Sequence, residues 1–189
     1  MIDILEAVYK FILQHAYDDK NGIPVLSENQ IVRAWQNYAA LPDTTEYVVI
    51  TYANKIQHGK SQIEDYYDDD SGEFGYRVYG TLEHVVQVDF SSQGPDVDPQ
   101  LTAARAQIVQ VLCASPVAPN FFKKFNSKLN LMYCDDIGPG PVFDESQNFQ
   151  ARYVLNLHIS EIFSKVIALD YFTEFNLKPE NVDVHHPAK

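Results

Sequence analysis

The sequence predicts an α+β fold, in which a mostly antiparallel β-sheet with a long extended hairpin is covered by two amphipathic helices. A run of β-branched and aromatic residues at 47–51 is typical of a buried strand, and residues 149–159 alternate strictly between apolar and polar. Two other segments have apolar residues at helical spacing. No linker or repeat divides the 189 residues, so we expect a single domain over 1–189.

The two predicted helices each present one apolar stripe. The first ends before Asn21-Gly22, and the second starts after Asp98, a candidate N-cap, and stops at Ser115-Pro116. We expect both stripes to face the core. Their residues are Leu5, Val8, Tyr9, Ile12 and Ala16 in the first helix, and Leu101, Ala104, Ile108, Val111 and Leu112 in the second.

Strands are predicted at 46–52, 82–90, 131–134 and 149–159. In the last of these, one face carries apolar side chains and the other is polar except for Val154. The apolar set is Phe149, Ala151, Tyr153, Leu155, Leu157 and Ile159. A short helical turn is expected at 120–125. The state of 27–35 stays open, 162–172 fits both helix and strand, and an extended piece is expected near Val182 and Val184.

The segment 55–80 is predicted to be a protruding hairpin with an acidic tip. Tyrosine offers a large contact area with a polar end and is enriched in protein interfaces, although ordinary packing along a two-stranded ribbon explains the aromatic residues as well. The interface candidates are Tyr66, Tyr67, Phe74, Tyr76 and Tyr79. The acidic tip, formed by Asp68, Asp69 and Asp70, is a candidate surface facing a partner or a channel lumen.

The charge balance disfavours nucleic-acid binding, because 14 Lys and Arg face 26 Asp and Glu, a net charge of -12. Acidity does suit a channel wall along which DNA must slide. Charged residues at positions 3, 6 and 10 argue against a signal peptide or membrane span at the N-terminus. Cys113 and Cys134 are interpreted as small buried thiols in preference to a disulfide.

No catalytic signature is found, and we expect no catalytic residue, cofactor or metal. The aspartates at 65 and 68–70 do not have EF-hand spacing, so a solvated charge run is favoured over a cation site. Asp135, Asp136, Asp144 and Glu145 are interpreted as turn and capping residues rather than an acid/base pair. His185 and His186 belong to an expected flexible tail, 185–189.

Several patterns that form the fold follow one another along the chain. They are Leu41-Pro42 followed by EYVVITY, then the hairpin, TLEHVVQVDF, AARAQIVQVLCASP, Cys134-Asp135-Asp136-Ile137, DESQNFQARYVLNLHI and DYFTEFNLKPENVDV. With these segments in this order, the chain resembles the phage neck terminator, or tail-completion, family over most of its length.

This resemblance implies a structural virion protein made in the host cytoplasm. Such terminators form a ring, commonly sixfold, that ends the tail tube and joins it to the head connector. The expected partners are further copies of the chain, the tail-tube protein and a neck or head-completion protein, with the tail sheath as an additional candidate. DNA would pass through the ring without specific binding, and no membrane is involved.

Three alternatives stay open at this point. Another head-tail junction or baseplate component would share the acidity and the fold class. A metal-dependent hydrolase would use the aspartate clusters and bind divalent ions tightly as a monomer. A host adaptor would bind one partner through the hairpin edge and remain monomeric.

Overall fold

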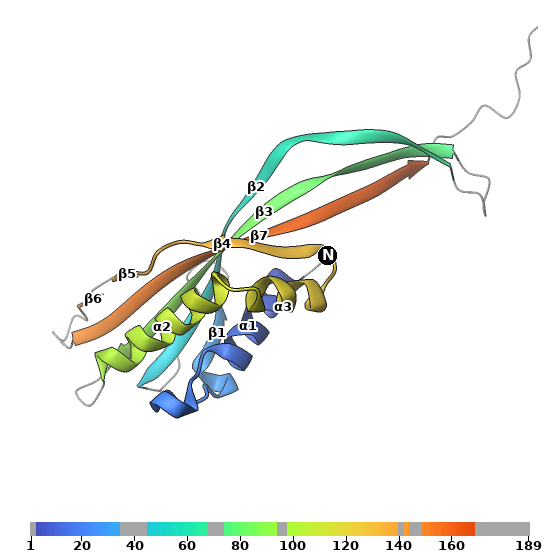
Figure 1. The fold of residues 1–189 in the computed structure, drawn as a ribbon. Coiled ribbons are helices and arrows are strands. Elements are labelled where there is room, and N and C mark those ends of the chain that lie inside the picture. Colours follow the sequence, from blue (N-terminus) through green and yellow to red (C-terminus); the bar gives the residue numbers. More distant parts are fainter. Residues whose placement is uncertain are drawn as a thin grey trace, which may run out of the picture.

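A computed structural model describes residues 3–34, 45–67, 74–93, 98–139, 142–143 and 149–168. These residues fold into one β-sheet with three α-helices packed over one part of it, while three long strands run on beyond the helices (Figure 1). The strand order is β1-β2-β3-β7-β4, and β5 and β6 also pair with β7. The predicted α+β class with a long extended hairpin is confirmed.

The three long strands are β2 (Glu46–Tyr67), β3 (Phe74–Gln93) and β7 (Phe149–Ala168). The strands predicted at 46–52 and 82–90 are therefore the inner ends of two much longer strands. Pairing of β3 with β7 is antiparallel and runs without a register shift from Gly75–Ala168 to Gln93–Gln150. The segment left open at 162–172 is strand as far as Ala168, and the remainder lies outside the described residues.

Shorter strands complete the sheet. β1 (Ile31–Ala34) follows a 3-10 turn at Glu28–Gln30 and pairs in parallel with β2. β4 (Leu129–Cys134), β5 (Gly138–Pro139) and β6 (Val142–Phe143) each pair antiparallel with β7. β7 therefore lies between the β2–β3 hairpin on one side and β4, β5 and β6 on the other.

The core lies between the helices and one face of the sheet. It is formed by Val48 and Ile50 of β2, by alternate residues of β3 and β7, and by the helices. From β3 and β7 it takes Val86, Val88, Phe90, Leu155, Leu157 and Ile159. The alternation predicted for 149–159 is confirmed from Ala151 onward, because Ala151, Leu155, Leu157 and Ile159 are buried and Tyr153 is partly buried, while the burial of Phe149 lies outside the description.

Helix α1 (Ile4–His15) matches its prediction, and its N-cap Asp3 accepts a hydrogen bond from the Glu6 amide. Leu5, Val8, Ile12 and Ala16 are buried. The expected turn at 120–125 is a full helix, α3 (Val117–Phe125), in which Ala118 and Phe122 are buried. The described part of the chain therefore contains three α-helices, whereas two helices and a short helical turn were predicted.

Helix α2 (Pro99–Cys113) begins at the predicted N-cap Asp98, whose side chain accepts a hydrogen bond from the Gln100 amide. The prediction of its buried stripe is wrong. Val111 is 66% exposed, and Leu101, Ala104, Ile108 and Leu112 are only partly buried. The buried residues are Thr102, Arg105, Ala106, Val109 and Cys113.

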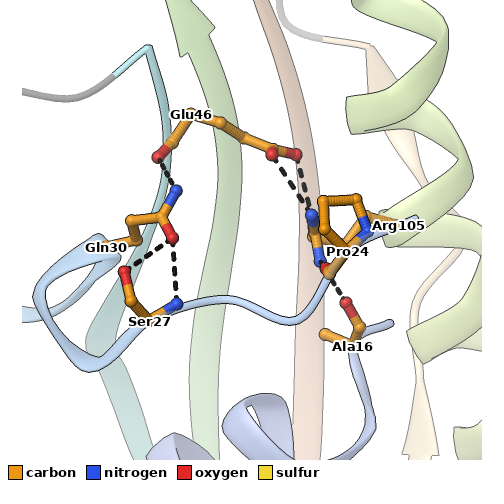
Figure 2. A network of polar contacts seen from close by, with 6 residues as sticks. All are labelled: Ala16, Pro24, Ser27, Gln30, Glu46 and Arg105. Carbon is orange, nitrogen blue, oxygen red and sulfur yellow. Dashed lines mark hydrogen bonds and ion pairs between the residues drawn. The ribbon is translucent and has the colours of Figure 1, made fainter. Parts of the chain in front are cut away.

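The buried arginine explains this orientation. Arg105 is 1% exposed, and its guanidinium makes two hydrogen bonds to the Glu46 carboxylate, at 2.9 and 3.1 Å (Figure 2). It also donates to the carbonyl oxygens of Ala16 and, at 2.8 Å, Pro24. A buried guanidinium requires such partners, so α2 must turn Arg105 towards β2 and the segment that follows α1.

The same network continues into the turn before β1. Gln30 donates from its side-chain amide to the Glu46 carbonyl oxygen at 3.1 Å, while its side-chain oxygen accepts from the Ser27 amide at 2.9 Å (Figure 2). Glu46, the first residue of β2, is therefore held by α2 through its carboxylate and by the 3-10 turn through its backbone.

We predict that Arg105→Met lowers the free energy of unfolding by about 3–5 kcal/mol, because it removes the cation that compensates the Glu46 carboxylate and a donor to two carbonyls. Urea unfolding measures this loss. Adding Glu46→Leu should recover part of it. As a control, Arg33→Met removes the exposed ion pair with Glu6 and should cost at most about 1 kcal/mol. An equally small loss for Arg105→Met would contradict the prediction.

Candidate assembly surface

The part of the sheet beyond the helices is formed by residues 55–67 of β2, 74–82 of β3 and 162–168 of β7, and we call it the extension (Figure 1). Paired residues in neighbouring strands share a face, and successive residues alternate. Because the β3–β7 register is unbroken, the faces of the extension continue those of the body. We call them the helix-side face, continuous with the face that packs on the helices, and the open-side face.

The helix-side face of the extension is a band of aromatic and aliphatic side chains. Tyr67 pairs with Phe74, Ile63 with Val78, and Tyr76 with Ile167. Phe163 lies over Gly80, where an added Cβ would come within 2.9 Å of the Phe163 ring. The charged residues on this face, Lys55, Asp65 and Lys165, lie on the two outer strands. Its apolar set is Ile63, Tyr67, Phe74, Tyr76, Val78, Leu82, Phe163 and Ile167.

The open-side face is more polar. Arg77 pairs with Glu64 at 3.2 Å and lies over the ring of Tyr66, with 4.6 Å from its guanidinium carbon to the ring centroid. Tyr79 lies on the same face, opposite Ser164. Ile56, Ile162 and Val166 are its exposed aliphatic residues.

The structure divides the five aromatic residues proposed as an interface from the sequence. Tyr67, Phe74 and Tyr76 lie on the helix-side face, whereas Tyr66 and Tyr79 lie on the open-side face. A single flat partner surface therefore meets one of these groups only. Sequence reasoning missed Ile63, Val78, Leu82, Phe163 and Ile167. Phe163 and Ile167 belong to β7, the third strand of the extension. In this strand Phe163, Lys165 and Ile167 lie on one face and Ile162, Ser164 and Val166 on the other, which is consistent with the two-residue periodicity of a strand.

A chain of polar contacts crosses the open-side face where the extension leaves the body. Glu83 of β3 is 4% exposed, and its carboxylate accepts hydrogen bonds from His158 of β7 and His58 of β2. These bonds hold the pKa of Glu83 below its usual value. His158 also stacks on Tyr133 of β4, with ring centroids 4.1 Å apart, and its Nε2 lies 3.3 Å from the Asp135 carboxylate.

A second set of contacts joins the same three strands on the helix side. The buried His84 follows Glu83 in β3, and its Nε2 donates to the Glu161 carboxylate at 2.7 Å. Its Nδ1 then accepts from the Tyr52 hydroxyl at 2.8 Å. Burial, with a further contribution from Glu161, raises the pKa of Tyr52. Two successive residues of β3 thus link β2 to β7, one on each face.

The aspartates that were considered as a possible catalytic or metal-binding site do not act together. Asp135 accepts from the Asn156 amide at 3.1 Å and Asp136 from the Gln110 amide at 3.2 Å, so these two serve different partners. Within the described ranges no three His, Cys, Asp or Glu side chains are arranged to hold a metal. Asp65 is exposed on the extension. Asp68, Asp69, Asp70, Asp144, Glu145, Val182, Val184, His185 and His186 lie outside the described residues.

Both cysteines are free thiols, with Cys113 buried and Cys134 partly buried. A hydrogen bond between them raises the pKa of Cys113 and lowers that of Cys134. In the described part of the chain no single helix is long and apolar enough to cross a bilayer. Only α2 and α3 together, bent by 76° at their junction, have that length and composition.

We predict that Glu83→Gln lowers the melting temperature by several degrees at neutral pH, because the histidines lose their shared carboxylate. The pKa of Glu83 is lowered in the folded state, so its stabilisation is present above the unfolded pKa of about 4.3 and is lost as the pH falls through the folded pKa. The difference in melting temperature between wild type and Glu83→Gln should therefore disappear as the pH is lowered. Melting curves from neutral to acidic pH test this.

Glu64→Gln is the control, because it alters the exposed ion pair with Arg77 and should change the melting temperature little at any pH. A gap between wild type and Glu83→Gln that stayed constant down to strongly acidic pH would contradict the assigned role of Glu83.

Comparison with known proteins adds the identity to this geometry. The family model described as phage neck terminator protein matches residues 3–183, nearly the whole chain. No curated protein is significantly similar to it. The matched span includes the helices, the sheet and the extension. The chain belongs to the phage neck terminator family and is a structural component of the neck of the virion.

Proposed function

We propose that this protein forms a ring of identical copies at the neck end of the phage tail, where it ends the tail tube and joins it to the head connector. The observation that carries the proposal is the extension, in which three strands project from the body with apolar side chains exposed on both faces. Patches of exposed apolar surface of this kind mark interaction sites. Family membership supports the location.

The role we propose is structural and without catalysis. A terminator must bind the growing end of the tube on one side and present a different surface on the other, so that no further tube subunit adds. Its partners would be the tail-tube protein on one side and a neck or head-completion protein on the other. A subunit that is asymmetric along its length, with a compact body and a projecting arm, suits this task.

The net charge of -12 fits a ring through which DNA passes. Repeated around a channel, acidic side chains create a potential that extends over about 8 Å at physiological salt and that opposes binding of phosphates. We propose that DNA slides through the ring without sequence-specific contacts and that Asp68, Asp69 and Asp70 add to the repulsion.

We predict that the purified chain assembles into a ring, either alone at high concentration or on added tail tubes. Light scattering over a range of concentrations measures the mass, and negative-stain images show the shape and whether tube ends are capped. A protein that stays monomeric at all concentrations and leaves tail tubes uncapped would overturn the proposed function.

A further inference from the structure

We propose that, in the ring, the helix-side face of the extension of one copy packs on the outer stripe of α2 in the next copy. The outer stripe consists of Leu101, Ala104, Ile108, Val111 and Leu112. The inference rests on the proposed ring and goes beyond it, because it names the two surfaces that meet and excludes the open-side face of the extension.

The first observation is that the helix-side face changes its covering partway along the sheet. Over the body this face is the core, and α1, α2 and α3 bury it. On the extension the same alternation continues, but the three helices lie over the other part of the sheet (Figure 1). Ile63, Tyr67, Tyr76 and Ile167 are exposed there. A helix from another copy would continue the helix layer on a surface already built to receive one.

The size of this face agrees with a docking role. The extension comprises 13, 9 and 7 residues of its three strands, and at about 3.3 Å per residue and about 4.8 Å between strands they give roughly 460 Å² of flat area. The largest apolar patch on a monomeric protein is typically about 300–600 Å² and is often functional.

The second observation is the surface of α2. Its only charged residue is Arg105, which is buried, so the exposed part of this 15-residue helix carries no charge in a chain of net charge -12. The other two helices differ: α1 presents Lys10 to solvent, and α3 presents Lys123 and Lys124. Depletion of charged residues is characteristic of the centre of a protein interface.

Most of the stripe is also turned away from the core of its own subunit, and only Leu112, at its edge, packs against that core. At 100° per residue its centre lies about 120° around the helix from the residues that face the sheet. Val111 is 66% exposed. The extension of the same chain projects away from α2 and cannot cover it (Figure 1). Each copy thus has two different apolar surfaces, which is the requirement for a head-to-tail contact that repeats around a ring.

The test compares neighbouring residues on opposite faces. Ile167, on the helix-side face, is 47% exposed, and Val166, on the open-side face, is 44% exposed. Ile167→Asp should raise the concentration needed for assembly about tenfold or more, because it places a charge in the contact. Val166→Asp introduces the same charge in the same strand and should leave assembly unchanged. Equal loss for both variants, or no loss for Ile167→Asp, would overturn the choice of face.

Complementation tests the pairing of the surfaces. Val111→Asp on α2 should raise the assembly concentration as Ile167→Asp does, with unchanged circular dichroism for both. A mixture of the two variants retains one intact contact, because the extension of the Val111→Asp variant and helix α2 of the Ile167→Asp variant are both unaltered. Ultracentrifugation at high concentration should therefore show a one-to-one dimer that neither variant forms alone. A mixture that stays monomeric would overturn the pairing.

These outcomes are separable from failure of the ring itself. If wild type neither assembles nor caps tail tubes, the proposed function fails. If wild type assembles and Ile167→Asp assembles equally well, the ring stands and only the assigned contact is wrong.

Discussion

The unbroken pairing of β3 with β7 is the constraint on which the rest of the structure depends. It spans 19 residue pairs, from the buried centre of the sheet to the far part of the extension. A slip of one residue would transfer every side chain of one strand to the opposite face. Because no slip occurs, the face that begins as the core at Phe90 and Tyr153 ends as the exposed apolar band at Tyr76 and Ile167. Fold and assembly surface therefore have one origin.

Arg105 acts similarly on the helix layer. Helix α2 has small side chains at Ala106 and Val109, and leucine and isoleucine side chains on a neighbouring stripe. Such a helix would be expected to bury the larger side chains. The guanidinium reverses this preference, since it needs the Glu46 carboxylate of β2 and two carbonyl oxygens of the segment that follows α1. The apolar area left outside is a cost to the free subunit. A cost of this kind is offset when the surface is covered in an assembly.

Much of the fold could be predicted because it follows from local periodicity. The α1 stripe and the alternation in 149–159 each depend on residues close in sequence. The prediction of the buried stripe of α2 was wrong because the partners of Arg105 lie 59 to 89 residues away in the sequence, and no local pattern contains them. The third strand of the extension was undecided for a related reason: 162–168 is strand because β3 offers it an edge. Of the candidate surface, Tyr67, Phe74 and Tyr76 could be found, but their separation from Tyr66 and Tyr79 required the register.

The two polar networks at the base of the extension bear on how such an arm could set the geometry of a ring. A three-stranded sheet attached only by its backbone would bend and twist about its base. Glu83 and His84 prevent this by joining β2 to β7 on opposite faces at the same point along β3, so bending towards either face must stretch one set of contacts. In a ring of heterologous contacts, the angle between the arm and the body fixes the rotation from one copy to the next and hence whether the ring closes. In the proposed ring, fixing that angle within the subunit would remove its cost from the assembly step, because a preorganised arm loses less conformational freedom when it binds.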